Sequence, residues 1–342
     1  MTRIDKIWSE LENEKSFSHG LLIRRYSGDV LPEIYVALIL PEKFRCVAAS
    51  FSSSINIRTS IFSNLRDICI EVFPDETKSE RNYLLFKLLN NDYKDIFSVL
   101  CEDLIMNISS VTNEDHLFRE LLKRFEKWKS LFTKAAASGL SAEEQRGLFG
   151  EIYCLRKLLK FNANFTYAIN SWVGPEKRPR DFQYSKWAIE VKTTHGNNHQ
   201  IIHINSELQL DTTNLDHLFL YHLSLDILQH SGETLNQIIE SVRCILSVDI
   251  FALIAFNTKL LEAGYFSHHL EKYESAGYFV RQNSYYWIRN NFPRIEEKDI
   301  RLGVGEVKYS IITSYCTEYK VSEEYVLSTV YSSMTNGKHR DI

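Results

Sequence analysis

The sequence lacks paired cysteines, an apolar leader and a transmembrane run, and each absence excludes a class of protein. Its six cysteines are scattered over 342 residues without a Cys-x-x-Cys pair, which argues against a disulfide framework or a structural zinc site and fits a reducing compartment. Charged side chains (Arg3, Asp5 and Lys6) stand where a signal peptide needs an apolar segment, and no apolar run reaches transmembrane length. We therefore expect a cytoplasmic protein with no membrane partner.

The sequence also has no excess of basic over acidic residues. Lys and Arg number 40 against 44 Asp and Glu, and the net charge of -4 excludes a polyanion binder that works by bulk electrostatics. Residues 171–192 are a local exception, because they hold five basic side chains and only three acidic ones. Any nucleic-acid-binding face is therefore expected to be local.

The content of hydrophobic residues (44%) and charged residues (25%) is that of an ordinary globular protein, long enough for two domains. Strand-sized blocks near 20–26, 33–39 and 45–50 predict a β-rich N-terminal half. Helices are expected near 91–100 and 114–136, the second with a clear apolar stripe. Small residues at 135–139 then mark the expected boundary between two domains. The sequence predicts a β-rich N-terminal domain over 1–138, which ends in a long helix, and a second domain over 139–342.

Three ionisable residues in the stretch 180–194 form the strongest candidate for a catalytic site. Glu190 and Lys192 lie two positions apart on an expected strand, 187–192, so their side chains share one face. A hairpin that joins this strand to the preceding one would bring Asp181 beside Glu190. Two converging carboxylates suit Mg²⁺, and a neighbouring lysine can orient a water and stabilise charge on a phosphoryl oxygen. The pattern predicts a metal-dependent phosphodiesterase; the alternative is the solvated face of an amphipathic strand.

A helix upstream of this stretch carries a further carboxylate. Ser141 and Glu144 have the spacing of a capping box, which predicts that a helix begins here. Glu151 lies at the edge of its apolar stripe, where a carboxylate is costly unless a cation or a donor meets it. Gly147 and Gly150 each cost about 1 kcal/mol in a helix interior, and close approach to a sheet would explain both. The alternative is a surface glutamate on a helix with a frayed first turn.

The C-terminal part predicts further strands near 199–205 and 217–223 and helices near 234–247 and 250–263. Aromatic and arginine side chains then alternate over 278–294. Such interleaving suits a nucleic-acid surface, and aromatic core strands give the same pattern.

Seven short segments together resemble a known family. They are 147–151 (GLFGE), 172–175 (WVGP), 180–182 (RDF), 189–194 (IEVKTT), 206–210 (SELQL), 292–295 (FPRI) and 305–311 (GEVKYSI). The sequence resembles the PD-(D/E)XK nuclease superfamily and, more narrowly, the bacterial PD-(D/E)XK motif proteins often encoded in restriction-type defence loci. One departure is visible: the superfamily's Pro-Asp reads Arg180-Asp181 here, with Pro179 one position early. Because that proline is not a ligand, the departure removes no chemical group.

The resemblance implies an α/β fold, a restriction-endonuclease-like core with a mixed central sheet flanked by helices, after the β-rich N-terminal domain. It implies a Mg²⁺-dependent endonuclease, with Mn²⁺ as a substitute, that hydrolyses DNA phosphodiester bonds in bacterial restriction-modification or antiviral defence. Asp181, Glu190 and the Val191 carbonyl would bind the metal, and Glu151 would join them directly or through water. Lys192 would orient the attacking water. The resemblance also implies that the polar side chain of Gln209 has a supporting role at this site.

The resemblance makes DNA the expected partner. Other defence proteins, such as a methyltransferase or an ATPase, and a second copy of this chain are further candidates. Two other functions stay open: a non-cleaving DNA-binding or assembly subunit on the same fold, and an RNA-acting or repair nuclease. Retention of all four polar side chains favours the enzyme, because a degenerate scaffold usually loses at least one.

Overall fold

The computed structural model of the chain contains two compact units. Unit 1 comprises residues 1–138 and 266–268, and unit 2 comprises 139–265 and 269–342. Within them, the structure describes residues 3–14, 18–55, 57, 67–135, 139–162, 164–196 and 200–336. That residues 1–138 and 139–342 fold as independent domains stays a prediction.

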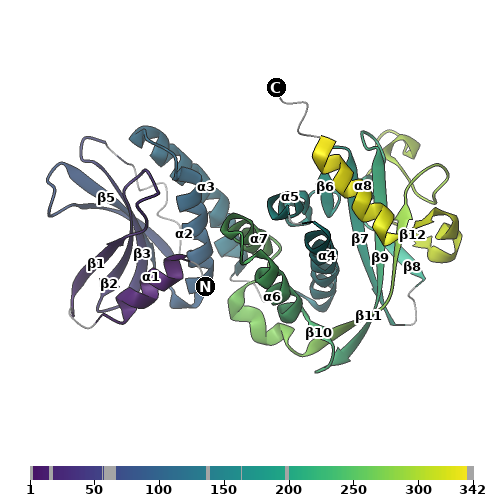
Figure 1. Cartoon of the computed structure of the whole chain (residues 1–342), viewed down its shortest axis with the longest axis horizontal. Helices are drawn as coiled ribbons and strands as arrows, with labels where there is room; N and C mark the ends of the chain where they lie inside the picture. The colour runs from purple at the N-terminus through teal and green to yellow at the C-terminus, as the bar shows by residue number, and fades with distance from the viewer. Residues whose placement is uncertain are drawn as a thin grey trace. The chain divides into compact units, whose positions relative to one another are not determined.

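Unit 1 is a five-stranded antiparallel sheet with helices packed against it (Figure 1). The strand order is β1-β2-β3-β5-β4, with bounds β1 Gly20–Arg25, β2 Ile34–Leu40, β3 Phe44–Ser52, β4 Ile68–Pro74 and β5 Arg81–Leu88. The helices are α1 Arg3–Glu12, α2 Lys94–Ile108, preceded by the short η2 Asn91–Tyr93, and α3 Glu114–Ala135. The strands and helices predicted for this half are therefore present.

A buried ionic contact joins the two long helices of unit 1. Asp103 on α2 accepts hydrogen bonds from Arg124 Nε (2.6 Å) and Trp128 Nε1 (2.8 Å), both on α3. A buried carboxylate is tolerated because cationic and neutral donors meet it.

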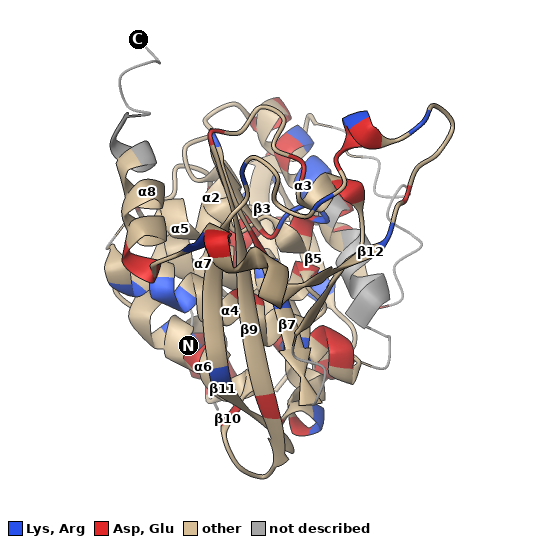
Figure 2. Ribbon diagram, turned by 90° about the vertical axis from the view of Figure 1, so that its right-hand side faces the viewer, with Lys and Arg blue, Asp and Glu red and all other residues tan. Residues whose placement is uncertain are grey.

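Unit 2 is built on a mixed sheet of order β10-β11-β9-β7-β6, with β13 also paired to β11. Strands β7 and β9 are parallel, and the other neighbours are antiparallel. Figure 2 shows β7, β9 and β11 side by side. The bounds are β6 Phe182–Tyr184, β7 Trp187–His195, β9 His217–Gln229, β10 Glu233–Thr234, β11 Ala276–Trp287 and β13 Lys320–Val321.

Two hydrophobic layers cover this sheet. One face packs on helices, with bounds α4 Ala142–Phe161, α5 Phe165–Ser171, α6 Leu235–Leu246, α7 Ile250–Glu262 and α8 Glu323–Asn336. The other face packs on a smaller layer made of the β8–β12 pair and the segment around the short helix η8, with bounds β8 Ile201–Ile204, β12 Tyr309–Ile312 and η8 Thr313–Tyr319. The predicted α/β fold, a mixed central sheet flanked by helices after an antiparallel N-terminal sheet, is confirmed.

The aromatic stretch 278–294 is largely a core strand. Tyr278, Tyr285 and Tyr286 are buried, and Arg281 on the same strand pairs with Asp226 at 2.5 Å. Of the two alternatives for this stretch, the core strand accounts for its tyrosines.

Candidate active site

The β6–β7 hairpin brings Asp181 and Glu190 together. Phe182 is opposite Ile189 in this pair, so Asp181, one residue before β6, lies opposite Glu190. Asp181 Oδ2 accepts a hydrogen bond of 2.7 Å from the backbone N–H of Val191. The two carboxylates therefore meet at the open end of the hairpin, with Asp181 just outside the strand on which we expected it.

Val191 offers a main-chain oxygen at the same place. Its side chain belongs to the helix-covered core, on the face opposite the carboxylates. In a strand, the N–H and C=O of one residue point toward the same neighbouring strand. Because the Val191 N–H meets Asp181, the Val191 carbonyl faces this edge of the sheet as well.

Lys192 and Gln209 complete the polar face. Lys192 Nζ forms an ion pair with Glu190 Oε1 at 2.9 Å and donates to Gln209 Oε1 at 3.0 Å. Gln209, in the short helix η5 Glu207–Gln209, also accepts a hydrogen bond from the Asn205 N–H at 2.8 Å. Glu190 is 1% exposed, and its Oε2 has no hydrogen-bond partner. An unsatisfied buried acceptor costs about 1–3 kcal/mol, and more when it is charged, so this oxygen is poised for a cation.

Helix α4 supplies Glu151. The predicted capping box of Ser141 and Glu144 is present, and Glu151 Oε2 accepts a hydrogen bond of 2.7 Å from Trp172 Nε1. The glycine prediction was half right. A Cβ on Gly150 would lie 2.4 Å from Thr193 Cγ2 on β7, whereas a Cβ on Gly147 would meet nothing within 4 Å. Close approach to the sheet therefore explains Gly150 but not Gly147, whose added Cβ would point into open space.

Gly174 leaves room between the carboxylate of Glu151, on α4, and that of Asp181, at the hairpin. A Cβ at this position would lie 2.8 Å from Glu151 Oε2 and 3.1 Å from Asp181 Oδ1. The backbone N–H groups of Val173 and Gly174 both donate to the Asp181 carbonyl, at 2.8 and 2.9 Å. The glycine thus lets the loop wrap around Asp181 while two carboxylate oxygens border one small space.

Lys259 on α7 anchors that loop. Its ammonium donates to the Trp172 carbonyl and pairs with Glu176 Oε1 at 2.8 Å. Sequence reasoning gave no role to Trp172, Gly174 or Lys259. The Trp-Val-Gly-Pro segment was visible as part of the family resemblance, whereas nothing local marked Lys259, because its partners lie more than 80 residues away along the chain.

Burial shifts the ionisation of all three carboxyl groups. It raises the pKa of Asp181 to about 6, against the opposing effects of Lys192 and the Val191 N–H. Burial and the charge of Asp181 raise the pKa of Glu190 to about 8. The same two causes raise the pKa of Glu151 well above its usual value, in spite of the Trp172 hydrogen bond. Burial would lower the pKa of Lys192, but the charge of Glu190 and the hydrogen bond to it outweigh burial and raise that pKa.

These residues fit a hydrated Mg²⁺ better than a fully protein-bound ion. Within the described ranges, no group of three or more His, Cys, Asp or Glu side chains is placed so that it could hold a metal. The predicted set with Glu151 as a third carboxylate therefore stays a prediction. Mg²⁺ usually keeps several waters and needs only one or two carboxylates. The buried free Oε2 of Glu190, Asp181 and the Val191 carbonyl provide hard oxygen donors of that kind.

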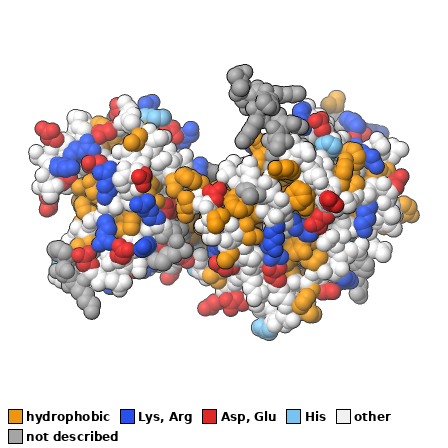
Figure 3. Space-filling model, in the orientation of Figure 1, with side chains coloured by type: hydrophobic (Ala, Val, Ile, Leu, Met, Phe, Trp, Pro, Cys, Tyr) orange, Lys and Arg blue, Asp and Glu red, His pale blue; other side chains and the backbone are white. Residues whose placement is uncertain are grey.

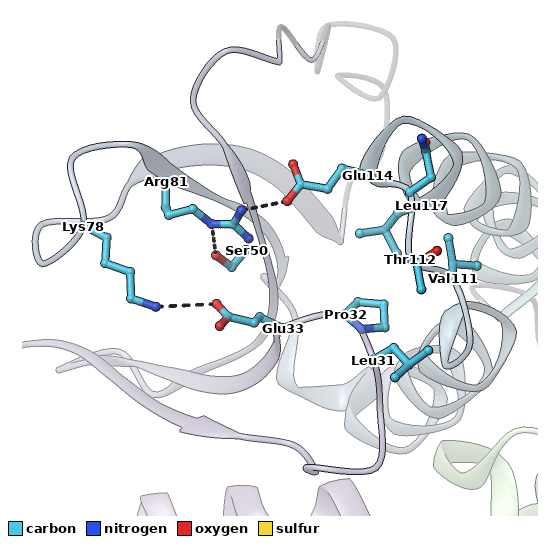
Figure 4. Close-up of a pocket in the computed structure, with 11 residues that line it drawn as sticks. Leu31, Pro32, Glu33, Ser50, Lys78, Arg81, Val111, Thr112, Glu114 and Leu117 are labelled. Atoms are coloured by element: carbon cyan, nitrogen blue, oxygen red, sulfur yellow. Dashed lines mark hydrogen bonds and ion pairs between the residues drawn. The ribbon is translucent and has the colours of Figure 1, made fainter.

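Unit 1 contains a separate cavity of about 520 Å³ (Figure 4). Its two cations pair with its two carboxylates: Arg81 with Glu114 at 2.7 Å, and Lys78 with Glu33 at 3.7 Å. Because these charges satisfy one another, the described residues of this cavity have no counterpart to the unpaired oxygen of Glu190.

The mixed sheet flanked by helices, with this carboxylate–lysine hairpin at its edge, defines a nuclease-like fold of the PD-(D/E)XK type. The chain belongs to the family DUF4420, whose sequence model matches residues 4–314 and has the description "Putative PD-(D/E)XK family member". Comparison with curated proteins and with solved structures gave no match. Among the described residues, no helix is both long and apolar enough to cross a membrane.

Proposed function

We propose that this chain is a Mg²⁺-dependent endonuclease that hydrolyses DNA phosphodiester bonds. The observation that carries the proposal is the buried, unpaired Oε2 of Glu190, on a residue that lies opposite Asp181 and whose other carboxylate oxygen, Oε1, pairs with Lys192 at 2.9 Å. A buried carboxyl pair of which Glu190 keeps its proton near neutral pH without metal, next to a charged lysine, is a costly arrangement for a fold to maintain without a function.

Each residue has a separate role in this proposal. Asp181, Glu190 and the Val191 carbonyl hold the metal, which when bound supplies a Lewis acid for the phosphoryl oxygens. Glu151 reaches it directly or through a water. Lys192 donates from Nζ to the attacking water and to the phosphate oxygen on which negative charge develops. Gln209 keeps Lys192 in place, because it accepts one of the three ammonium protons.

DNA binding must use local features of the surface. Figure 3 shows Lys and Arg side chains interspersed with Asp and Glu on the visible face of each unit, in keeping with the net charge of -4. Affinity would come from individual phosphate contacts around the site, and it would fall steeply with added salt.

A second function on the same fold is also proposed as a candidate. No group of three acidic, histidine or cysteine side chains is placed to hold a metal in the described part of the chain. A non-cleaving DNA-binding or assembly subunit on this fold would need no such group.

Plasmid cleavage tests the two functions against each other. We expect the protein to nick or linearise plasmid DNA with Mg²⁺ or Mn²⁺ and not with EDTA. Asp181→Asn should abolish cleavage, whereas Asp216→Asn, at an exposed aspartate of the same unit, should not. Binding of DNA without cleavage under every metal would favour the subunit, and cleavage of RNA alone would make the chain a ribonuclease.

We also propose, from the resemblance to proteins of restriction-type loci, that the DNA substrate belongs to a defence reaction. Paired plasmids with and without base methylation distinguish this role, because a restriction enzyme cuts one of them preferentially. Adding a candidate methyltransferase or ATPase tests whether a partner is required. Sedimentation at several protein concentrations tests for a homodimer.

A further inference from the structure

Arg180 occupies the position at which the superfamily motif has proline. Proline has no side-chain donor, so every polar contact made by Arg180 is a feature of this chain rather than of the motif. One guanidinium nitrogen, Nη2, donates to the backbone carbonyl of Asp211, and Nη1 donates to Gln183 Oε1 at 3.3 Å. Its Nε is buried without a partner. The side chain therefore lies against the protein and joins two segments.

The first segment is the carboxylate hairpin itself. Gln183 is on β6, and Arg180 directly precedes Asp181. The second segment, residues 205–213, carries the support for Lys192. Within it, Gln209 Oε1 accepts hydrogen bonds from Lys192 Nζ and from the Asn205 N–H.

Segment 205–213 has a further anchor at Thr212. The Thr212 N–H and Oγ1 both donate to Glu296 Oε1, at 3.2 and 2.7 Å. Glu296 is 5% exposed and forms an ion pair with Arg294 at 3.1 Å. Arg180 and Glu296 thus fix adjacent residues, Asp211 and Thr212, and Arg180 adds a second tie between this segment and the carboxylate hairpin to the one made by Lys192 and Gln209.

We propose that Arg180 is a positioning residue that holds segment 205–213, and with it Gln209, against Lys192. If the guanidinium is removed, Gln209 can move away from the hairpin, and the ammonium of Lys192 loses a fixed acceptor. A lysine that must serve a reacting group has to be held within a fraction of an ångström, and a small misplacement lowers turnover on the order of 10²-fold in unfavourable cases. The catalytic consequence rests on the proposed nuclease function, whereas the structural link does not.

The test compares Arg180→Ala with Arg178→Ala. Arg178 is a matched control, because it lies two residues away, is 67% exposed and reaches Glu176 only at 4.0 Å. Hydrogen–deuterium exchange should become faster over 205–213 in Arg180→Ala and stay unchanged in Arg178→Ala. The kcat for plasmid cleavage should fall on the order of 10-fold or more, while the KM for DNA stays within about twofold.

A double mutant separates positioning from substrate binding. If Arg180 acts through Gln209, Arg180→Ala combined with Gln209→Ala should be no slower than the slower single variant. Additive losses, or a raised KM with unchanged kcat, would overturn the proposal in favour of direct phosphate binding by Arg180. Unchanged exchange over 205–213 would overturn it outright.

The experiment still gives an answer if Arg180→Ala fails to fold or if the wild type is inactive. If Arg180→Ala does not fold, the same measurements apply to Arg180→Lys, whose single ammonium cannot bridge both acceptors and should give an intermediate exchange rate. If the wild type cleaves nothing with any metal, the nuclease function fails, and the exchange comparison alone decides whether Arg180 positions the segment.

Discussion

Lys192 touches two acceptors, and the two contacts have different consequences. The contact with Glu190, which is 1% exposed, offsets the charge of that carboxyl group whenever it is ionised, and the hydrogen bond to Gln209 fixes the direction of the ammonium. Because Oε2 of Glu190 stays unpaired, the lysine leaves one carboxylate oxygen to another cation. In the proposed mechanism, the same residue therefore offsets the charge of Glu190 without metal and acts on the attacking water when metal is bound.

Lys192→Ala should lower the rate of DNA cleavage on the order of 10²-fold or more, the effect of losing one preorganised electrostatic group. DNA affinity measured in Ca²⁺ should change little, because binding is spread over many phosphate contacts. Lys186→Ala is the control, since Lys186 is exposed in the turn of the same hairpin. Wild-type cleavage by Lys192→Ala beside an inactive Asp181→Asn would remove the lysine from the mechanism.

The raised carboxyl pKa values predict how stability depends on pH. Glu190 binds its proton up to about pH 8 in the folded protein, well above the value of an unfolded glutamate. The folded state then holds more protons than the unfolded state between about pH 4.5 and 8. Without metal, the contribution of this group to the free energy of unfolding should therefore be complete below about pH 4.5, fall as the pH rises toward 8, and level off above pH 8.

Thermal melts in EDTA from pH 5 to 9 measure this effect. Glu190→Gln should flatten the profile between pH 5 and 8, whereas Glu271→Gln, at an exposed glutamate, should leave it unchanged. Mn²⁺ should restore wild-type stability at pH 8, because a divalent cation replaces the proton, and should not stabilise Glu190→Gln to the same extent. A wild-type stability that rises through this range would contradict the assignment.

At the scale of elements, the two glycines of α4 form a matched pair. Gly150→Ala should destabilise the protein by about 1–3 kcal/mol, the usual cost of overpacking, because the new Cβ would lie 2.4 Å from Thr193 Cγ2. Gly147→Ala should stabilise it by up to about 1 kcal/mol, because the new Cβ meets open space and alanine favours the helix. Urea unfolding of both variants measures the difference, and equal effects would mean that α4 does not pack on β7 in this register.

The sequence predicted the hairpin that carries the site and the face of the sheet on which its side chains lie. It did not predict the tertiary packing that completes the site. Alternation along 187–192 set Glu190 and Lys192 on one face, and the short hairpin set Asp181 opposite Glu190, because both are local properties of a strand pair. The indole that binds Glu151 and the ammonium that binds the Trp172 carbonyl come from segments brought together only by the tertiary fold. The pairing of β8 with β12, about 100 residues apart, was equally invisible in local patterns.

At the scale of the whole molecule, the sequence boundary at 135–139 coincides with the division between units 1 and 2. Residues 136–138 of the predicted boundary lie outside the described residues. The proposed site is made entirely by unit 2 residues.

A fragment of residues 139–342 should therefore bind Mn²⁺ in calorimetry with an affinity close to that of the full chain. Asp181→Asn in the same fragment is the control that should not bind. Limited proteolysis of the full chain should cut first near 135–139. First cuts elsewhere, or a fragment that folds but does not bind, would indicate one fused domain in which residues 1–138 support the site.

The hydrogen bond from Trp172 to Glu151 makes the site observable without a substrate. An indole N–H that donates to a carboxylate has a chemical shift that depends on whether the carboxylate is protonated or coordinated. The chain has five tryptophans. Trp8, whose indole donates to the backbone carbonyls of Ala37 and Cys46, gives an internal reference that neither pH nor metal should move. In a proton–nitrogen spectrum, the Trp172 indole resonance should therefore shift during an Mg²⁺ titration while the Trp8 resonance stays fixed, so that occupancy of the site can be read directly from the intact protein.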